Sequence, residues 1–465
     1  MKKRILAALV ASAAVLSLAG CNTDNNNGSG AGNSNSNSNS NSGSSNAGDS
    51  GNSNAGTTAA PEEGTLTILT WNGNSDTKTM VETFLEAKGY PADSVKFVGI
   101  GDNGEGARDG YKQYIKGDGD ADLFIMDAGW TMMYTYDNEV SASYETIGLS
   151  KSDFPDAFPY TLSYGSNGEG QLMANSFQAT PGGFIYRSDL AEQYLGIKSP
   201  DEMTALISDW DKFKAAGKTL AEASGGTCAL QSTEGGMWEV FQANRSQPWV
   251  VDGKLVLGEA EAFYDLVVEM KNDKSLGLFP QWETPWYQSV KDGSALGDFA
   301  PTWGLTTNEG SILFNMTDGS EELGKNMAFC EAPSSYFWGG SYIGVSNKCN
   351  NPVLAKEFIE YFCKDADSMK AYAEKTGDFV NNKSVMSSLT TSNKLLNGQN
   401  HYTTLVKVMD KLDLEGKLTQ YDSTIKGCFN DSVNALLDGL VSTKEEAIVK
   451  FKQDVKAALP DIDVE

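Results

Sequence analysis

The order of apolar and polar positions predicts alternating strands and helices from residue 64 onward. Three short segments have the alternation or the apolar content of strands: residues 65–71, 95–100 and 122–126. Between them, apolar residues recur at helical spacing in residues 80–85 and 111–115. This order of strands and helices predicts an α/β fold that begins with a parallel sheet.

The same alternation continues toward the C-terminus. Further helical faces are found at residues 354–362, 369–372 and 448–459. Strand-like segments are found at residues 183–186, 254–257 and 341–345. Because residues 64–465 are more than a single hydrophobic core usually supports, we expect two lobes.

The N-terminus has the pattern of an export signal. Lys2, Lys3 and Arg4 precede an uncharged apolar stretch at residues 5–18, which is shorter than the roughly 20 residues that span a bilayer. Leu-Ala-Gly then leads directly into Cys21, which resembles the lipobox of bacterial lipoproteins. We predict a signal peptide at residues 1–20, lipidation of Cys21, and no other membrane attachment.

Residues 21–63 differ in composition from the rest of the chain. After Cys21 they are almost entirely Asn, Ser, Gly, Ala and Thr, without an aromatic or large aliphatic residue. Such a segment cannot form a packed core, so a flexible tether is expected. By analogy with surface lipoproteins, a long polar tether favours a Gram-positive cell and the outer face of its membrane.

Composition excludes several classes of function. The chain has 36 Lys and Arg against 62 Asp and Glu, a formal charge of −26, which argues against binding to nucleic acid. His401 is the only histidine, so His-dependent triads and His-rich zinc sites are nearly excluded. The chain also lacks a phosphate-binding loop and paired Cys-x-x-Cys motifs. We expect no cofactor, no metal and no catalytic residues, although a glycosidase pair of carboxylates has no spacing rule that would exclude it.

The cysteines after Cys21 show no metal-binding spacing. They are Cys228, Cys330, Cys349, Cys363 and Cys428. Their number is odd, and Cys363 lies on the apolar face of a predicted helix. Burial as small hydrophobic residues is the favoured interpretation, and one disulfide, for instance between Cys330 and Cys349, is compatible with export.

The nine tryptophans are the most informative residues. Many stand beside polar residues or glycine. Sugar rings pack on indoles while their hydroxyls bond to acids and amides, so this composition suits a carbohydrate. It also suits a cation, through attraction to the aromatic face. Trp210 is interpreted as structural, with Ser208 as the N-cap of its helix.

Two of these aromatic positions follow predicted strands of the first sheet. Trp71 ends the first strand, and Asp127 and Trp130 follow the third. Ligands of open α/β sheets bind outside the carboxyl ends of the strands. We therefore predict that these three residues belong to a ligand-binding wall.

An ordered set of segments resembles the extracellular solute-binding proteins of carbohydrate ABC importers, the family that includes maltose-binding protein. The segments are TLTILTW (65–71), PGGFIYRSDL (181–190), DWDKFKAA (209–216), KDGSAL (291–296), APTWG (300–304), GGSYI (339–343), AKEFIEYF (355–362) and KAYAEKTG (370–377). Each alone is weak, but they follow one another in the family's order.

The resemblance implies a two-lobed α/β fold of the type II periplasmic-binding-protein class, with hinge crossovers. Crossovers are expected near Gly183, Gly340 and Val380. The implied lobes are residues 64–181 plus 343–383 and residues 182–342 plus 384–465. The implied ligand-binding residues are Trp71, Asp127, Trp130, Gln178, Glu234, Trp238, Trp286, Tyr287, Trp303 and Trp338. Trp249 and Trp282 are interpreted as surface or packing residues.

The resemblance also implies a function without catalysis. A monomeric, lipid-anchored receptor would capture an oligosaccharide between its lobes and deliver it to the permease subunits of an ABC importer. A polyamine or other cation receptor is the alternative binder. A surface glycoside hydrolase and a structural adhesin are the alternatives from other classes.

Overall fold

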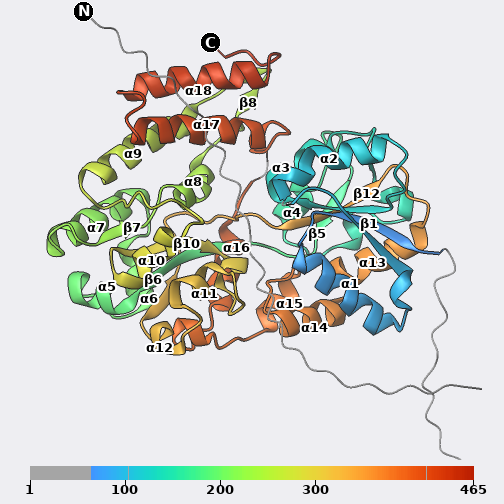
Figure 1. The fold of residues 1–465 in the computed structure, drawn as a ribbon, viewed down its shortest axis with the longest axis horizontal. Coiled ribbons are helices and arrows are strands. Elements are labelled where there is room, and N and C mark those ends of the chain that lie inside the picture. The colour runs from blue at the N-terminus through green and yellow to red at the C-terminus, as the bar shows by residue number, and fades with distance from the viewer. Residues whose placement is uncertain (1–63, 103, 415, 465) are drawn as a thin grey trace, which may run out of the picture. The chain divides into compact units, whose positions relative to one another are not determined.

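The computed structural model describes residues 64–102, 104–414 and 416–464 (Figure 1). The predicted signal peptide, Cys21 and the tether lie outside these residues. Within the described part, no helix is both long enough and apolar enough to cross a membrane. The alternation of helices and strands expected from the sequence is present throughout, which confirms the α/β class.

The first sheet contains the N-terminal strands. Its members are β1 (Leu66–Thr70), β2 (Val95–Gly99), β3 (Leu123–Asp127), β4 (Ser141–Ala142), β5 (Ala174–Ser176) and β12 (Ser341–Ser346). The parallel start is confirmed, because β1 pairs in parallel with both β2 and β3. β12 returns from far along the chain and pairs antiparallel to β3, with Ser341 opposite Asp127.

Helices from both ends of the sequence belong with the first sheet. They are α1 (Ser75–Lys88), α2 (Gly104–Lys116), α3 (Ala128–Thr135), α4 (Pro159–Tyr164), α13 (Pro352–Cys363) and α14 (Ala366–Thr376). Phe84 of α1 meets Phe358 of α13 edge to face, with ring centroids 5.2 Å apart. Phe177 meets Tyr372 of α14 in the same way at 6.0 Å. The first lobe is therefore built from discontinuous segments.

The second sheet has the order β11-β6-β10-β7. Its strands are β6 (Gly182–Arg187), β7 (Ala229–Gln231), β10 (Ala295–Pro301) and β11 (Met327–Cys330). The helices along this part of the chain are α5 (Ser188–Leu195), α6 (Pro200–Leu206), α7 (Trp210–Ala223), α8 (Gly235–Phe241), α9 (Glu261–Asn272), α10 (Thr284–Asp292), α11 (Ile312–Thr317) and α12 (Glu321–Gly324).

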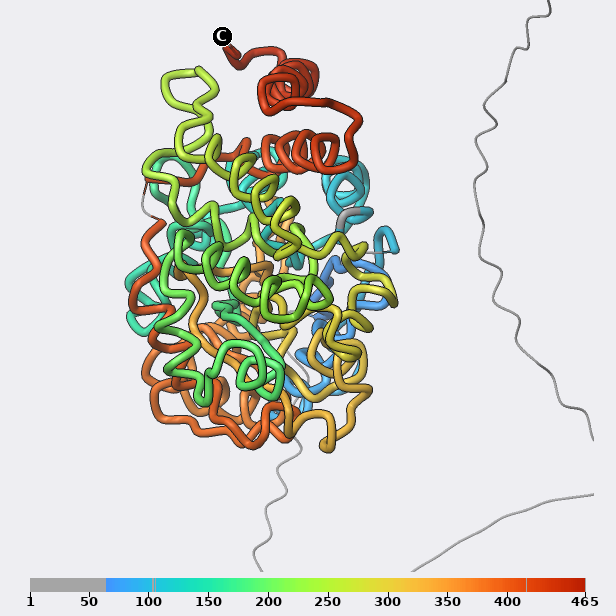
Figure 2. Tube along the Cα trace, turned by 90° about the vertical axis from the view of Figure 1, so that its left-hand side faces the viewer, coloured from blue at the N-terminus to red at the C-terminus, as the bar shows by residue number. Residues whose placement is uncertain are grey.

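The C-terminal helices complete the fold. They are α15 (Lys383–Ser388), α16 (Tyr402–Lys411), α17 (Asp422–Leu437) and α18 (Lys444–Ala458). α17 and α18 lie side by side at one end of the second lobe (Figure 1, Figure 2). A two-stranded sheet of β8 (Val250–Val251) and β9 (Lys254–Leu255) lies near them in Figure 1. The strand predicted at residues 254–257 is therefore observed only at residues 254–255.

The described chain passes between the two sheets in residues 177–181 and 331–340, and residues 377–382, which join α14 to α15, form a third crossover. These crossovers are neighbours, because isolated bridges pair Gln178 with Val380 and Pro181 with Phe337. Two α/β lobes joined by adjacent crossovers confirm the predicted fold. The exact residue bounds of each lobe stay a prediction.

Two local interpretations of the sequence are corrected by the structure. Helix α7 is capped by Asp209, whose side chain accepts from Lys212 N, and not by Ser208. The compatible disulfide between Cys330 and Cys349 is not formed, because Cys330 is a buried free thiol. Cys363 is buried on α13 as the apolar pattern predicted.

Candidate functional site

Four indoles gather where the second lobe meets the second crossover. Trp282 stacks on Trp303 with centroids 5.9 Å apart and planes 26° from parallel. It also meets Trp286 at 5.0 Å and Trp338 at 5.9 Å, both edge to face. We call Trp282, Trp286, Trp303 and Trp338 the indole cluster. Residues far apart in sequence thus form one aromatic surface.

Trp286 is the buried anchor of the indole cluster. It lies on α10, and its indole Nε1 donates to Ser232 Oγ at 2.9 Å and to Asp298 Oδ2 at 2.5 Å. Asp298 is fully buried in β10 and also accepts from Gln231 Nε2 at 2.5 Å. Burial raises the pKa of Asp298 to about 6, against the lowering effect of its hydrogen bonds. This network fixes the orientation of the Trp286 ring.

The outer members of the indole cluster are more accessible. Trp303 lies in the short 3-10 helix η6 (Thr302–Leu305), and its Nε1 donates to the carbonyl oxygen of Trp338 at 2.9 Å. This bond ties the second crossover to the end of β10. Trp282 has a positive φ of 70° and is 50% exposed. Its exposure leaves an indole face available to a ligand.

A cavity of about 390 Å³ opens beside Trp282 and Trp338. It is lined by Glu234, Gly235, Trp238, Glu239, Phe263, Gln281, Trp282, Trp338, Asn430, Val433 and Asn434. We call it the polar cavity. Two of its donors, Trp238 Nε1 and Gln281 Nε2, are buried and have no hydrogen-bond partner within the described part of the chain. Burial raises the pKa of Glu234, which precedes α8.

A second cavity, of about 260 Å³, adjoins it between the lobes. Asp127, Ala128, Gly129 and Tyr164 line it from the first lobe, and Tyr336–Gly339 from the second crossover. Glu239, Gln242, Ala243 and Arg245 line it from the end of α8 onward, and the remaining lining residues are Leu412, Leu414, Lys417, Leu418, Asp422, Ser423 and Lys426. We call it the interlobe cavity. Glu239 and Trp338 line both cavities.

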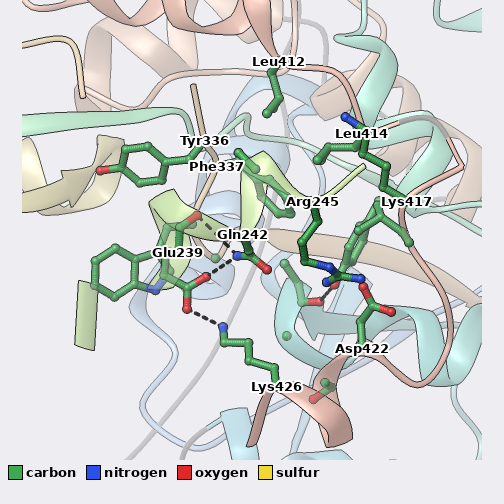
Figure 3. A pocket seen from close by; sticks show the side chains of 18 of the residues that line it. Glu239, Gln242, Arg245, Tyr336, Phe337, Leu412, Leu414, Lys417, Asp422 and Lys426 are labelled. Atoms are coloured by element: carbon green, nitrogen blue, oxygen red, sulfur yellow. Dashed lines mark hydrogen bonds and ion pairs between the residues drawn. The ribbon is translucent and has the colours of Figure 1, made fainter. Parts of the chain in front are cut away.

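Charged groups in the interlobe cavity are arranged in pairs (Figure 3). Glu239 accepts from Gln242 Nε2 at 2.8 Å and forms an ion pair with Lys426. Arg245 stacks over Trp249 at 4.2 Å, and burial lowers its pKa to about 10. Burial raises the pKa of Asp422, and the attraction of Arg245 opposes that rise. The balance of positive and negative groups suits a neutral guest.

The structure places the predicted ligand-binding residues in three groups. Glu234, Trp238 and Trp338 line the polar cavity, and Asp127 lines the interlobe cavity. Trp286 and Trp303 belong to the indole cluster, and Tyr287 packs on Trp286 with centroids 4.7 Å apart. Trp286, Tyr287 and Trp303 line neither cavity, and the same is true of the third group, Trp71, Trp130 and Gln178.

Each residue outside the cavities has a structural environment of its own. Trp71 is half-buried against the apolar core at the end of β1. Trp130 on α3 is buried, and its ring meets Tyr111 of α2 edge to face with centroids 5.6 Å apart. Gln178 joins the crossovers by hydrogen bonds. Asp127 itself caps α3 through Gly129 N at 2.7 Å, in addition to facing the interlobe cavity.

Sequence reasoning missed several lining residues. Trp282 was interpreted as a surface or packing residue, yet it forms part of the indole cluster and lines the polar cavity. Trp282 lies four residues before Trp286 in the sequence, and this spacing could have indicated that the two indoles lie together. Gln281, Asn430 and Asn434 had no signal, nor did the interlobe residues beyond position 411, because they are common polar and aliphatic residues. Trp249 is buried packing, as expected.

The described residues contain no group of three or more His, Cys, Asp or Glu side chains that could hold a metal ion. The linings of the two cavities provide indole faces, carboxylates, amides and paired charges.

The fold and these cavities define a two-lobed ligand-binding protein, with lining residues contributed by both lobes and by the crossover between them. Residues 45–396 match the family of bacterial extracellular solute-binding proteins, and the chain belongs to this family. No protein with a curated description matches the sequence.

Several solved structures have the same fold, and the similarity extends over nearly the whole length of each solved chain. An extracellular solute-binding protein of family 1 has a TM-score of 0.73 at 18% identity, covering 84% of this chain and 99% of its own. The galacto-N-biose-/lacto-N-biose I-binding protein of Bifidobacterium longum has a TM-score of 0.65 at 16% identity, covering 86% and 98%. The GacH receptor of Streptomyces glaucescens has a TM-score of 0.64 at 15% identity, covering 86% and 99%.

Proposed function

We propose that this protein is the substrate-binding component of an ABC importer and that it captures an oligosaccharide between its lobes. The observation that carries the proposal is the polar cavity. There, two indoles stand beside two buried donors, Trp238 Nε1 and Gln281 Nε2, that have no partner within the described residues. A buried donor without a partner is costly, so a ligand that supplies acceptors stabilises the site.

A sugar satisfies both features of the polar cavity at once. Its C–H faces pack on the indoles of Trp282 and Trp338, and its ring and hydroxyl oxygens offer acceptors to the two donors that have no partner. Its hydroxyls in turn donate to acceptors such as the carboxylate of Glu234. Two of the solved structures with this fold hold sugar-like ligands, acarbose in the GacH receptor and lacto-N-biose in the B. longum protein.

The adjacent crossovers support binding by lobe closure. A ligand that contacts residues of both lobes favours the closed arrangement by the difference between its contacts in the two states. Trp338 lies on the second crossover and lines both cavities, so a ligand on this indole contacts the hinge itself. The closed form would then dock on the permease and release its sugar unaltered.

Anchoring is a separate part of the proposal. We infer that Cys21 carries the lipid that holds the mature chain, as a monomer, on the outer face of a Gram-positive membrane. The lipobox before Cys21 and the polar tether after it support this inference, together with the extracellular character of the family.

A thermal-shift screen against neutral oligosaccharides, polyamines and other small cations tests the function. A sugar that binds the folded protein raises its melting temperature, and calorimetry should then show saturable binding with little dependence on salt. Binding of a polyamine that weakens steeply with salt would replace the proposal with a cation receptor. Release of new reducing ends during incubation would replace it with a glycoside hydrolase.

A further inference from the structure

We propose that the natural ligand is a glycoside that carries an apolar group, such as an aryl or short acyl substituent. Its sugar would occupy the polar cavity and its apolar group the interlobe cavity. This inference rests on the proposed function and adds the chemical class of the ligand.

The first argument is the apolar wall of the interlobe cavity, formed by Phe337, Leu412, Leu414 and Leu418. All four side chains are half-buried and retain accessible surface. Figure 3 shows Leu412 and Leu414 away from Glu239, Lys426 and Asp422, with Lys417 beside Leu414. A sugar hydroxyl placed on this wall would lose its water without gaining a partner. An apolar group placed there gains free energy by burial.

The second argument is that the charged side of the cavity is already satisfied. Glu239 is bonded to Gln242 and Lys426, and Asp422 accepts from Thr419 Oγ1 at 2.6 Å and Thr419 N at 3.0 Å. Arg245 donates to Gln247 O and stacks on an indole. Two residues that line the polar cavity, by contrast, carry buried donors without a hydrogen-bond partner in the described part of the chain. The donors without a partner therefore belong to the polar cavity, and the apolar wall belongs to the adjoining interlobe cavity.

The third argument is continuity. Trp338 and Glu239 line both cavities, so one molecule can extend from one into the other past the Trp338 ring. The volume of about 260 Å³ is sufficient for an aromatic ring, since benzene occupies an engineered apolar cavity of about 150 Å³. A free monosaccharide or disaccharide confined to the polar cavity would leave the apolar wall uncovered.

Calorimetry with matched glycosides tests the inference on the whole protein. For maltose, cellobiose, lactose and xylobiose, the probes are the free disaccharide, its methyl glycoside and its 4-nitrophenyl glycoside. For the disaccharide that binds, we expect the 4-nitrophenyl glycoside to bind at least about tenfold more tightly than the methyl glycoside. That ratio corresponds to about 1.4 kcal/mol.

Variants locate the effect in the interlobe cavity. Leu418→Asn and, separately, Leu412→Asn should remove the preference, so that the 4-nitrophenyl glycoside binds no more tightly than the methyl glycoside. Leu440→Asn, at a leucine that is 79% exposed and outside both cavities, is the matched control. It should keep the preference.

The outcomes separate the two proposals. Equal affinity for methyl and 4-nitrophenyl glycosides, or a preference that survives both leucine variants, overturns the inference and leaves the proposed function standing. Absence of binding by every probe of either kind overturns both.

Discussion

Gln178 Nε2 donates a hydrogen bond to Asp378 Oδ2 at 2.9 Å, joining the first crossover to the third. The other end of the same amide, Oε1, accepts from Ser341 N at 3.1 Å, where the second crossover enters β12. Asp378 Oδ1 accepts from Phe379 N at 2.8 Å. One glutamine thus connects all of the crossovers identified above, and its amide orientation is fixed by a donor on one side and an acceptor on the other.

Replacing Asp378 with Asn should destabilise this junction. Ser341 N requires the oxygen of the Gln178 amide, and Phe379 N requires the oxygen of the amide introduced at position 378. The NH2 groups of the two amides then face each other, and turning either amide around places an NH2 group against one of these backbone N–H groups. We expect Asp378→Asn to lower the free energy of unfolding by about 1 to 3 kcal/mol. Urea denaturation at pH 5 measures the loss, with Asp102→Asn, at an exposed aspartate, as the control.

The pH dependence of the same variant gives a second test. Burial, with the nearby charge of Asp76, raises the pKa of Asp378 from 3.8 to about 7 in the folded protein. Stability that depends on this raised pKa is fully present below about pH 4 and is lost as the pH rises through 7. Asn does not titrate, so the deficit of Asp378→Asn should be smaller at pH 8 than at pH 5. An equal loss of stability at both pH values would contradict a raised pKa of Asp378 in the folded protein.

A substitution of Trp282 tests whether an exposed indole of the cluster binds the sugar. Because Trp282 is 50% exposed, Trp282→Ala should change the free energy of unfolding by less than about 0.5 kcal/mol. It should weaken binding of a sugar by about 1 to 3 kcal/mol through loss of the stacking surface. Titration calorimetry measures the change, and Phe97→Ala, at an exposed ring on β2, is the control. An unaltered affinity in Trp282→Ala would remove this residue from the site.

Asp298 acts on the site through Trp286 and is a positioning residue. In Asp298→Asn one of the two oxygens becomes a donor, so either Trp286 Nε1 or Gln231 Nε2 loses one of its two acceptors. We expect a change in the near-ultraviolet circular dichroism of the tryptophans and an affinity for sugar reduced about fivefold, or about 1 kcal/mol. A purely structural role would lower stability while leaving the affinity of the folded protein intact.

Cys21 tests the anchor. Cys21→Ser should abolish incorporation of labelled fatty acid and move the protein from the membrane fraction to the medium, because the lipid is the proposed attachment. Cys428→Ser, at a half-buried thiol, should leave both properties unchanged. Retention of the Cys21→Ser chain at the membrane would require a different attachment.

The sequence determined the features that depend on local order. Residues 65–71, 95–100 and 122–126 become β1, β2 and β3, because the alternation of apolar positions and the intervening helical periodicity act over a few residues. The helical faces predicted at residues 354–362 and 369–372 lie within α13 and α14, and the strand predicted at residues 341–345 lies within β12. The α/β class and two-lobed architecture were therefore predictable.

Only the tertiary structure decided what each tryptophan does. Trp130 is buried in the first lobe, while Trp282 is exposed on the indole cluster, although both follow polar or glycine residues in the sequence. Likewise, Gln178 became a hinge residue through partners at positions 341 and 378. Exposure and hydrogen-bond partners depend on segments hundreds of residues apart, and local periodicity carries no information about such contacts.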